Sequence, residues 1–314
     1  VSIGIGGGTV EGISFNRRIR MKDGSIRMNW ENLPEAEIAS PAGPIDPEVG
    51  VARIDNQEEN PIAFLINFTN HAAILTGDNL LISADYPGYT TGMVEQIYPG
   101  TVALFTNGAE GNVNHIDVHN PIQTLKIRGF KEAERTGRIL GGEVVKVIEN
   151  IKPEELRKVR SFSQRINLPL REISEAELQR AKGVVEASRG KKLFLVDGVP
   201  KEIYAREIVK LSQRKDKPAP AEVQVITLGD KVALVGVPGE VFVELGLEIK
   251  QSSKFPYTFV LGLANGYVGY IPTSAAFDQG GYEVKTASWS KFDRSAGEIL
   301  VVAVMGMVGE SLRD

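Results

Sequence analysis

The distribution of hydrophobic and polar positions predicts strands and helices that follow one another along the chain. Residues 61–68 and 101–106 are nearly continuous apolar runs of strand length, which is typical of strands that are covered on both faces. Residues 86–97 predict a short helix that is opened by Asp85 as its cap and closed by Pro99-Gly100. Apolar side chains at helical spacing predict a second helix over residues 131–151, stopped by Pro153.

The second half of the chain continues the same alternation. In order, the pattern predicts a charged helix near residues 174–189, a polar break at 215–220, two strands at 223–228 and 231–237, a helix at 241–250, a strand at 257–263 and an apolar element at 299–308. Gly229-Asp230 predicts a hairpin turn between the first two of these strands. Together these elements predict an α/β fold, with a mixed β-sheet core and flanking helices, in a single catalytic-type domain that spans residues 1–314.

The first 50 residues follow a different pattern. A dinucleotide-binding fingerprint needs a strand before its glycines and a helix after them, whereas here a β-like run at residues 9–15 follows the glycines. The opening therefore predicts a glycine-rich edge strand or turn. Residues 16–50 are polar and contain four prolines, which predicts a long excursion without packed elements. Because the chain starts at Val1 without a leader, we also expect an N-terminal segment to be missing, and the compartment stays open.

Composition narrows the partners and excludes some chemistry. The net charge is −4 and the basic residues are spread along the chain, so nucleic acid is not an expected partner. The chain has no cysteine, which excludes disulfides, thiolate zinc sites and cysteine nucleophiles. No apolar run approaches the roughly 20 residues that a transmembrane helix needs. A small-molecule or lipid-like substrate remains as the expected partner, and the oligomeric state stays open.

Four polar residues lie at the predicted carboxyl ends of strands. His71 follows the strand at 61–68, and His115 ends the glycine-rich loop after the strand at 101–106. Glu240 stands where a strand gives way to a helix, and Tyr270 lies just past the strand at 257–263. Open α/β sheets bind their ligands at this edge. Imidazole and carboxylate groups can bind zinc there and leave one position open for water.

Each of these residues also has a structural interpretation. A histidine at a strand end can serve as a hydrogen-bonded structural residue, and Glu240 can be favoured by the dipole of its helix. Tyr270 can be a core or rim aromatic. The spacing His115-x-Asp117-x-His119 would place three side chains on one face of a strand, where they could bind metal, but a solvated loop is an equal alternative.

The order and spacing of several short segments resemble those of the neutral/alkaline non-lysosomal ceramidase family, from Val1 to about residue 310. The matching segments are Gly8-Thr-Val-Glu-Gly-Ile-Ser-Phe-Asn-Arg, Phe64-Leu-Ile-Asn-Phe-Thr-Asn-His71, Asp85-Tyr-Pro-Gly-Tyr, Gly239-Glu240-Val-Phe, Tyr267-Val-Gly-Tyr270-Ile-Pro-Thr and Gly281-Tyr-Glu283. The resemblance implies a zinc ion that is held by His71, Glu240 and Tyr270.

The sequence departs from the family in three places. The His-Thr-His segment that carries the family's first zinc ligand has no counterpart, so we expect another ligand from a preceding segment, from His115 or from His119. Asn114 stands where the family has a serine implicated in catalysis. The family's C-terminal immunoglobulin-like domain has no counterpart either.

These departures leave a specific chemical hypothesis. An asparagine cannot act as a nucleophile, although its amide can donate to an oxyanion. Attack by metal-bound water survives this change, and His115 or Asp85 would move the proton. The sequence therefore predicts a zinc-dependent hydrolase of N-acyl amide bonds. The alternatives are a non-catalytic lipid- or glycan-binding relative and a metal-dependent esterase or deacetylase on the same fold.

Overall fold

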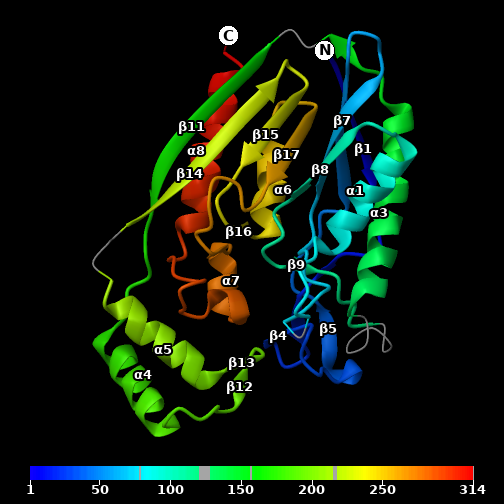
Figure 1. Cartoon of the computed structure of the whole chain (residues 1–314). Coiled ribbons are helices and arrows are strands. Elements are labelled where there is room, and N and C mark those ends of the chain that lie inside the picture. The colour runs from blue at the N-terminus through cyan, green and yellow to red at the C-terminus, as the bar shows by residue number, and fades with distance from the viewer. Residues whose placement is uncertain (78, 120–127, 156–157, 215–217, 314) are drawn as a thin grey trace.

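The core consists of two stacked β-sheets with helices on both outer faces (Figure 1). The computed structural model describes residues 1–314 except 78, 120–127, 156–157, 215–217 and 314. The first sheet has the strand order β10 (Glu154–Glu155), β1 (Ser2–Thr9), β6 (Glu48–Asp55), β7 (Pro61–Phe68), β8 (Val102–Asn107). The second has the order β11 (Val159–Leu168), β14 (Ala219–Leu228), β15 (Val232–Gly236), β17 (Tyr257–Leu261). Both sheets contain parallel and antiparallel pairs, which confirms the predicted α/β class. The core has two such sheets, whereas the sequence analysis expects one.

The alternation of side chains along β7 shows how the layers are built. Phe64, Ile66 and Phe68 face outward, where they pack against α1 (Asp85–Ile97) and α3 (Phe130–Asn150). Leu65 points the other way, into a thin apolar layer between the two sheets. Full burial of one such side chain contributes about 1.5–3 kcal/mol, so both faces of this strand stabilise the fold.

The second sheet is covered in the same way on its own outer face. There, α8 (Ala296–Ser311) packs against β11 and β14, and α6 (Val243–Ser252) packs against β17. Phe259 of β17 points inward and contributes to the layer between the sheets. The four layers are therefore helix, sheet, sheet and helix.

The glycine-rich opening is a strand at the sheet edge, as the sequence predicts. Among the described residues, Ser2 and Ile3 of β1 pair with β10, and the glycines that follow pair with one strand, β6. A Cβ atom on Gly4 or Gly8 would lie 2.2 Å or 2.1 Å from side-chain atoms of Ile151 or Glu143. These glycines are needed because α3 and the turn after it lie directly on the strand. The β-like run expected at residues 9–15 is wrong, since β1 ends at Thr9 and the next strand, β2 (Phe15–Asn16), begins only at Phe15.

The predicted excursion over residues 16–50 contains packed structure, and this expectation is wrong. A three-stranded sheet forms there from β4 (Ile26–Met28), β3 (Arg18–Met21) and β5 (Ile38–Pro41), with a 3-10 turn at η1 (Glu35–Glu37). Ile19, Met21 and Ile38 form a small apolar cluster under it. The strands are three or four residues long, too short to give a readable alternation.

Most of the other predicted elements are confirmed within a few residues. The apolar element at 299–308 is part of helix α8, and the helix near 174–189 is α4 (Glu175–Ser188). The sequence pattern misses β11 and α5 (Lys201–Ser212). It also misses short elements, namely β9 (Val113–Asn114), β12 (Leu195–Val196), β13 (Val199–Pro200), β16 (Glu240–Val241), β18 (Tyr270–Ile271), α7 (Ser274–Gln279) and η2 (Tyr282–Val284).

Helices α4 and α5 form a hairpin that projects from one end of the sheets (Figure 1). The hairpin is tied to the loop after η2. The Tyr204 ring lies 6.1 Å from the Trp289 ring, and Ser288 N donates to Glu207 Oε2 over 2.9 Å. The Ser174 side chain caps α4 by accepting from Glu177 N.

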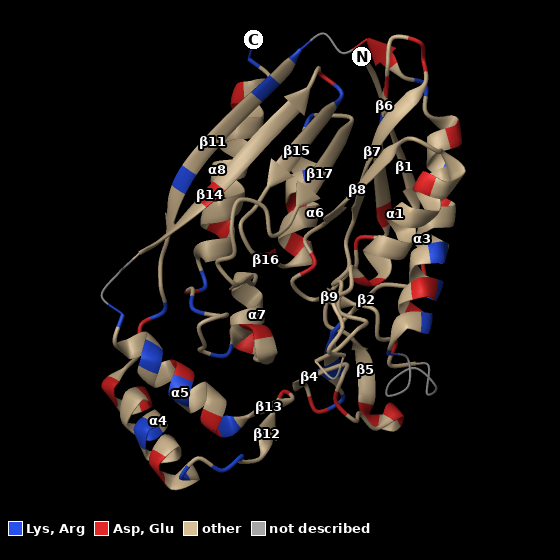
Figure 2. Cartoon of the chain, viewed as in Figure 1, with Lys and Arg blue, Asp and Glu red and all other residues tan. Residues whose placement is uncertain are grey.

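Charged residues of both signs are interspersed along α3, α4 and α5 (Figure 2). Among the described residues, no helix combines the length and the apolar character that would let it cross a bilayer.

Candidate active site

Two strand ends bring His71 and Glu240 into contact. His71 comes three residues after β7, and Glu240 opens β16. The Nε2 atom of His71 lies 2.9 Å from Oε1 of Glu240. Glu240 is in register with Tyr270 because β16 and β18 are parallel neighbours. The three residues that are far apart in the sequence thus share one corner of the fold.

A contact with the backbone of β9 fixes the orientation of the His71 ring. Its Nδ1 atom lies 2.9 Å from the backbone oxygen of Val113 in β9. A carbonyl oxygen only accepts, so Nδ1 carries a proton, and in neutral imidazole Nε2 is then a lone-pair donor. This lone pair faces a carboxylate oxygen. Two electron-pair donors at this separation require a proton or a cation between them.

Glu240 is held by more than His71. The Tyr267 hydroxyl donates to its Oε2 over 2.9 Å. Burial raises the pKa of Glu240, but the contacts with His71 and Tyr270, together with the charge of Arg17, outweigh burial and leave the pKa below its ordinary value. Glu240 is therefore an ionised carboxylate at neutral pH. Its side chain is 12% exposed, so it can be reached from solvent.

Arg17 is a site residue whose role the motif reading misses. Its Nη1 lies 3.3 Å from Nε2 of His71, and its guanidinium lies 5.1 Å from the centre of the Tyr270 ring. Arg17 is buried, and its Nη2 has no hydrogen-bond partner in the part of the chain that the structure describes. In the sequence, the feature that points to Arg17 is its position at the end of the family-like segment 8–17. An arginine near a glycine-rich strand has no other sequence feature that indicates a site.

A second carboxylate anchors this arginine. Glu283 in η2 accepts from Arg17 Nε over 2.7 Å and from Arg18 Nη1 over 2.8 Å. Glu283 is fully buried. Burial raises its pKa, but the charges of the two arginines outweigh burial and lower it. The two carboxylates at this corner therefore have different environments, one saturated by arginines and one open towards solvent.

The donor set fits a zinc ion in part. His71 Nε2 and Glu240 Oε1 are a nitrogen and an oxygen of the kinds that zinc prefers, and the bond from Nδ1 to a carbonyl is the usual support of a metal-binding histidine. Tyr270 would be the third donor. Burial raises the pKa of its phenol well above the ordinary value, so this phenol is neutral in the structure. Across the described ranges, no group of three or more His, Cys, Asp or Glu residues is placed to hold a metal.

Asp85 is the first residue of α1, and both oxygens of its carboxylate accept hydrogen bonds from backbone N–H groups. Leu75 N donates to Oδ2 over 2.8 Å, and Tyr86 N donates to Oδ1 over 2.7 Å. These bonds close the loop that follows His71. The prediction of Asp85 as helix cap is wrong by one residue, because Ala84 is the N-cap and Asp85 is the first helical residue, with a φ of 54°. Its proposed part in proton transfer stays a prediction.

Asn114 is buried and paired with Asn29. The two amides donate to each other, over 2.6 Å from Asn29 Nδ2 and over 3.0 Å from Asn114 Nδ2. The oxygen of Asn114 also accepts from Ile116 N. The amide that the sequence suggested as an oxyanion donor is thus engaged within the protein, and its catalytic role stays a prediction.

The spacing His115-x-Asp117-x-His119 does not form a strand. Strand β9 ends at Asn114, and the residues that follow form a loop. His115 is buried, Asp117 is half-buried and His119 is exposed, so the three side chains have different surroundings. The loop of the alternative interpretation is confirmed, because β9 pairs with the two-residue strand β2 and neither continues, but it is not solvated at His115, which is buried. The suggested parts of His115 and His119 as further ligands stay predictions.

Comparison with known proteins supports the resemblance at the level of the fold. No family model and no curated protein matches the sequence. The structure of neutral ceramidase from Pseudomonas aeruginosa is similar, with a TM-score of 0.69 and 17% identity, covering 98% of this chain and 51% of that chain. A ceramidase complexed with C2 is similar with a TM-score of 0.68 and 16% identity, covering 98% and 53%. The chain thus has a ceramidase-like fold and spans about half the length of these proteins.

Proposed function

We propose that the protein is a metal-dependent hydrolase of acyl bonds, with His71, Glu240 and Tyr270 as ligands of one zinc ion. The observation that carries this proposal is the contact of 2.9 Å between His71 Nε2 and Glu240 Oε1, with the other ring nitrogen bonded to Val113 O. A protein seldom directs a lone pair at a carboxylate unless a proton or a cation lies between them. The ceramidase-like fold adds support, since both similar structures are named as ceramidases.

When bound, zinc supplies a Lewis acid and lowers the pKa of a water molecule towards 7. The residues of this chain orient and complement that chemistry. Val113 O fixes the His71 ring, and Tyr267 holds the second oxygen of Glu240. The Nη2 of Arg17, for which the described residues offer no hydrogen-bond partner, is a buried charged donor beside this pair and is suited to a developing oxyanion. In this proposal Arg17 takes the part for which the Asn114 amide is not available.

The acyl bond is proposed to be an N-acyl amide, as in the compounds that ceramidases cleave. An ester or an acetyl group on a polar substrate is the alternative on the same site, because metal-activated water attacks either carbonyl. Comparing acyl amides with acyl esters separates the two.

Hydrolysis with and without metal tests the proposal. The purified protein is incubated with a panel of fluorogenic acyl amides and esters, with added zinc or with a chelator. We expect turnover with zinc, loss of turnover with chelator, and loss of turnover in Glu240→Gln. The variant Glu58→Gln, which changes an exposed carboxylate, is the matched control and should keep full activity. Turnover that persists in Glu240→Gln, or no turnover of any substrate with zinc, contradicts the proposal.

A non-catalytic binding protein is a second candidate, and two observations favour it. Asn114 replaces the family's serine and is paired with Asn29, and Arg17 already places a positive charge 3.3 Å from His71 Nε2. This candidate predicts that a lipid or glycan ligand binds equally well with and without chelator.

A further inference from the structure

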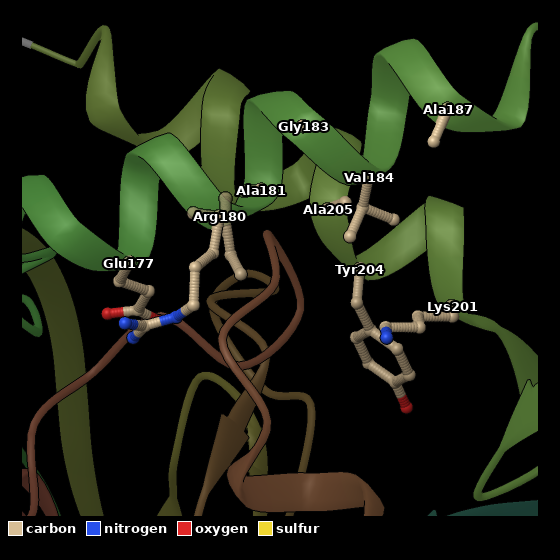
Figure 3. Close-up of a pocket in the computed structure, with 10 residues that line it drawn as sticks. Glu177, Arg180, Ala181, Gly183, Val184, Ala187, Lys201, Tyr204 and Ala205 are labelled. Carbon is tan, nitrogen blue, oxygen red and sulfur yellow. The ribbon is translucent and has the colours of Figure 1, made fainter.

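A small polar cavity lies where α4, α5 and the segment after β11 meet the loop that follows η2. Its volume is about 220 Å³. It differs from the larger groove between α4 and α5, which has a floor of small and aliphatic side chains and, at one end, Glu177 and Arg180 (Figure 3). Three cationic side chains line the smaller cavity, those of Arg171, Arg214 and Lys291. The cavity is therefore a candidate site for an anion.

The backbone holds Arg171 and Lys291 next to each other. Arg171 comes three residues after β11, and its N–H donates to the carbonyl oxygen of Lys291 over 2.9 Å. The adjoining residues Leu170 and Phe292 form an antiparallel bridge. Two cations that line the same cavity repel each other, and an anion between them turns this repulsion into attraction.

One nitrogen of the Arg171 guanidinium has no hydrogen-bond partner among the described residues. Nη1 donates to Thr286 Oγ1 over 2.9 Å, and the guanidinium lies 5.0 Å from the centre of the Phe277 ring. Nη2 is the buried atom that lacks a partner. Burial lowers the pKa of Arg171, and the negative charges of Glu177 and Asp293 do not offset this effect. Buried donors are nearly always satisfied, so Nη2 calls for an acceptor.

The Lys291 ammonium also keeps part of its capacity to donate. It donates to the backbone oxygens of Val268 and Ser288, whereas an ammonium group has three hydrogens. Burial, together with the positive charge of Arg214, lowers the pKa of Lys291 to about 8. Lys291 is therefore mainly protonated at neutral pH, in surroundings where positive charge is not balanced.

The carboxylate that lines the cavity does not neutralise these cations. Glu175 is exposed, and its Oε1 accepts from Gln179 Nε2 over 2.6 Å. Water screens such an exposed group, so its attraction for a cation is weak. Within the described ranges, no salt bridge joins a carboxylate to Arg171, Arg214 or Lys291. The lining thus has three cations against one exposed carboxylate.

We propose that this cavity binds a small oxyanion, which is free phosphate or sulfate or the phosphate group of a monoester. Arginine presents its donors as a fork that fits such oxygens, and lysine adds a point charge. The volume of about 220 Å³ is several times the roughly 30 Å³ that one water occupies in the liquid, so the ion fits together with water. The site is independent of the proposed hydrolysis, because none of its lining residues belongs to the contact of His71 with Glu240.

Isothermal titration calorimetry with sodium sulfate, at pH 7 and constant ionic strength, tests the proposal. We expect wild type to bind one sulfate per chain, and sodium chloride to give no saturable heat. Arg214→Gln removes an exposed charge from the lining and should raise the Kd for sulfate several-fold. Arg206→Gln is the matched control, since Arg206 is an exposed arginine of α5 outside the cavity, and it should leave the Kd unchanged. Lys291→Met should raise the Kd by about tenfold or more, because it removes a charged hydrogen-bond donor.

The absence of saturable sulfate binding in wild type overturns the proposal. Equal Kd values for wild type, Arg214→Gln and Lys291→Met overturn it too, and Arg214→Gln decides alone if Lys291→Met does not fold. Sodium phosphate and glycerol phosphate, titrated in the same way, separate the two sources of the oxyanion. Tighter binding of glycerol phosphate supports the phosphate group of a larger compound, and tighter binding of inorganic phosphate supports the free ion.

Discussion

Two carboxylates at one corner of the fold, Glu283 and Glu240, have opposite surroundings. Glu283 is fully buried and bound by Arg17 and Arg18, so its charge is neutralised within the protein. Glu240 is reached from solvent and faces His71 and the Tyr267 hydroxyl, neither of which is a fixed cation. The saturated carboxylate holds strands and loops together. The open one keeps free coordination capacity, which is the property a metal or substrate site needs.

The comparison predicts that the saturated carboxylate matters most for stability. Replacing Glu283 by alanine leaves two buried arginines without their counter-charge, and breaking such a buried pair costs about 3–5 kcal/mol. Glu240→Ala removes hydrogen bonds from a more exposed group, which costs roughly 1 kcal/mol. Urea unfolding of both variants measures the difference. Equal destabilisation by the two substitutions would break the comparison.

The open carboxylate and its partner should matter most for activity. We expect His71→Ala to lower kcat/KM by about 100-fold or more, because loss of a residue in direct contact with the reacting groups costs this order. Its unfolding midpoint should stay close to that of wild type. Glu58→Ala is the control, since Glu58 is exposed and lies outside the candidate site, and it should keep both properties. Unchanged kcat/KM in His71→Ala would contradict this expectation.

The comparison extends to a third carboxylate, Glu110, which is buried without a hydrogen-bond partner among the described residues. It is 1% exposed, and neither oxygen has a hydrogen-bond partner in the described part of the chain. Burial raises its pKa from about 4.5 to about 8. At pH values between about 4.5 and about 8, the Glu110 carboxyl is ionised in the unfolded chain and protonated in the folded chain. The unfolding free energy therefore falls as pH rises, by about 1.4 kcal/mol per pH unit for this group.

Glu110→Gln tests this directly, because glutamine resembles the protonated acid and does not titrate. Unfolding free energies of wild type and variant are measured between pH 5 and pH 9. The variant should lose the decline that Glu110 contributes up to about pH 8. The same pH dependence in both proteins would show that Glu110 is ionised in the folded state.

The smallest effect is expected at the pair of amides. Asn114→Ser introduces the residue that the ceramidase family has at this position and leaves Asn29 without its reciprocal partner. We expect a loss of about 1 kcal/mol in the free energy of unfolding. The control Asn60→Ser, at an exposed turn, should be neutral. A gain in hydrolysis in Asn114→Ser would show that the serine hydroxyl can take part in the reaction.

Regular patterns made most of the core predictable. The run at 61–68 is strand β7 residue for residue, and the helix predicted at 131–151 is α3 within one residue at each end. Strand β11 was missed because only Ile166 and Leu168 of its ten residues are buried. Its position is set by its pairing with β14 along the whole length, and that pairing has no local signature.

The sequence predicts individual residues of the candidate site from short motifs, but it does not predict the contacts between them. His71 and Glu240 stand in recognisable segments, but their contact joins residues 169 positions apart. Arg17 and Glu283, 266 positions apart, illustrate the limit. An arginine that is buried by a distant carboxylate carries no periodicity and no turn signal. The place of Arg17 in the candidate site follows from three-dimensional contacts alone.

Metal binding is the most direct test of the central claim. Wild type, Glu240→Ala and Glu58→Ala are each dialysed against zinc and then against buffer. The zinc that stays bound to each protein is then measured. Convergence of His71 Nε2 and Glu240 Oε1 on one cation predicts one zinc per chain in wild type and Glu58→Ala, and none in Glu240→Ala. Equal zinc content in wild type and Glu240→Ala, or none in wild type, would contradict it.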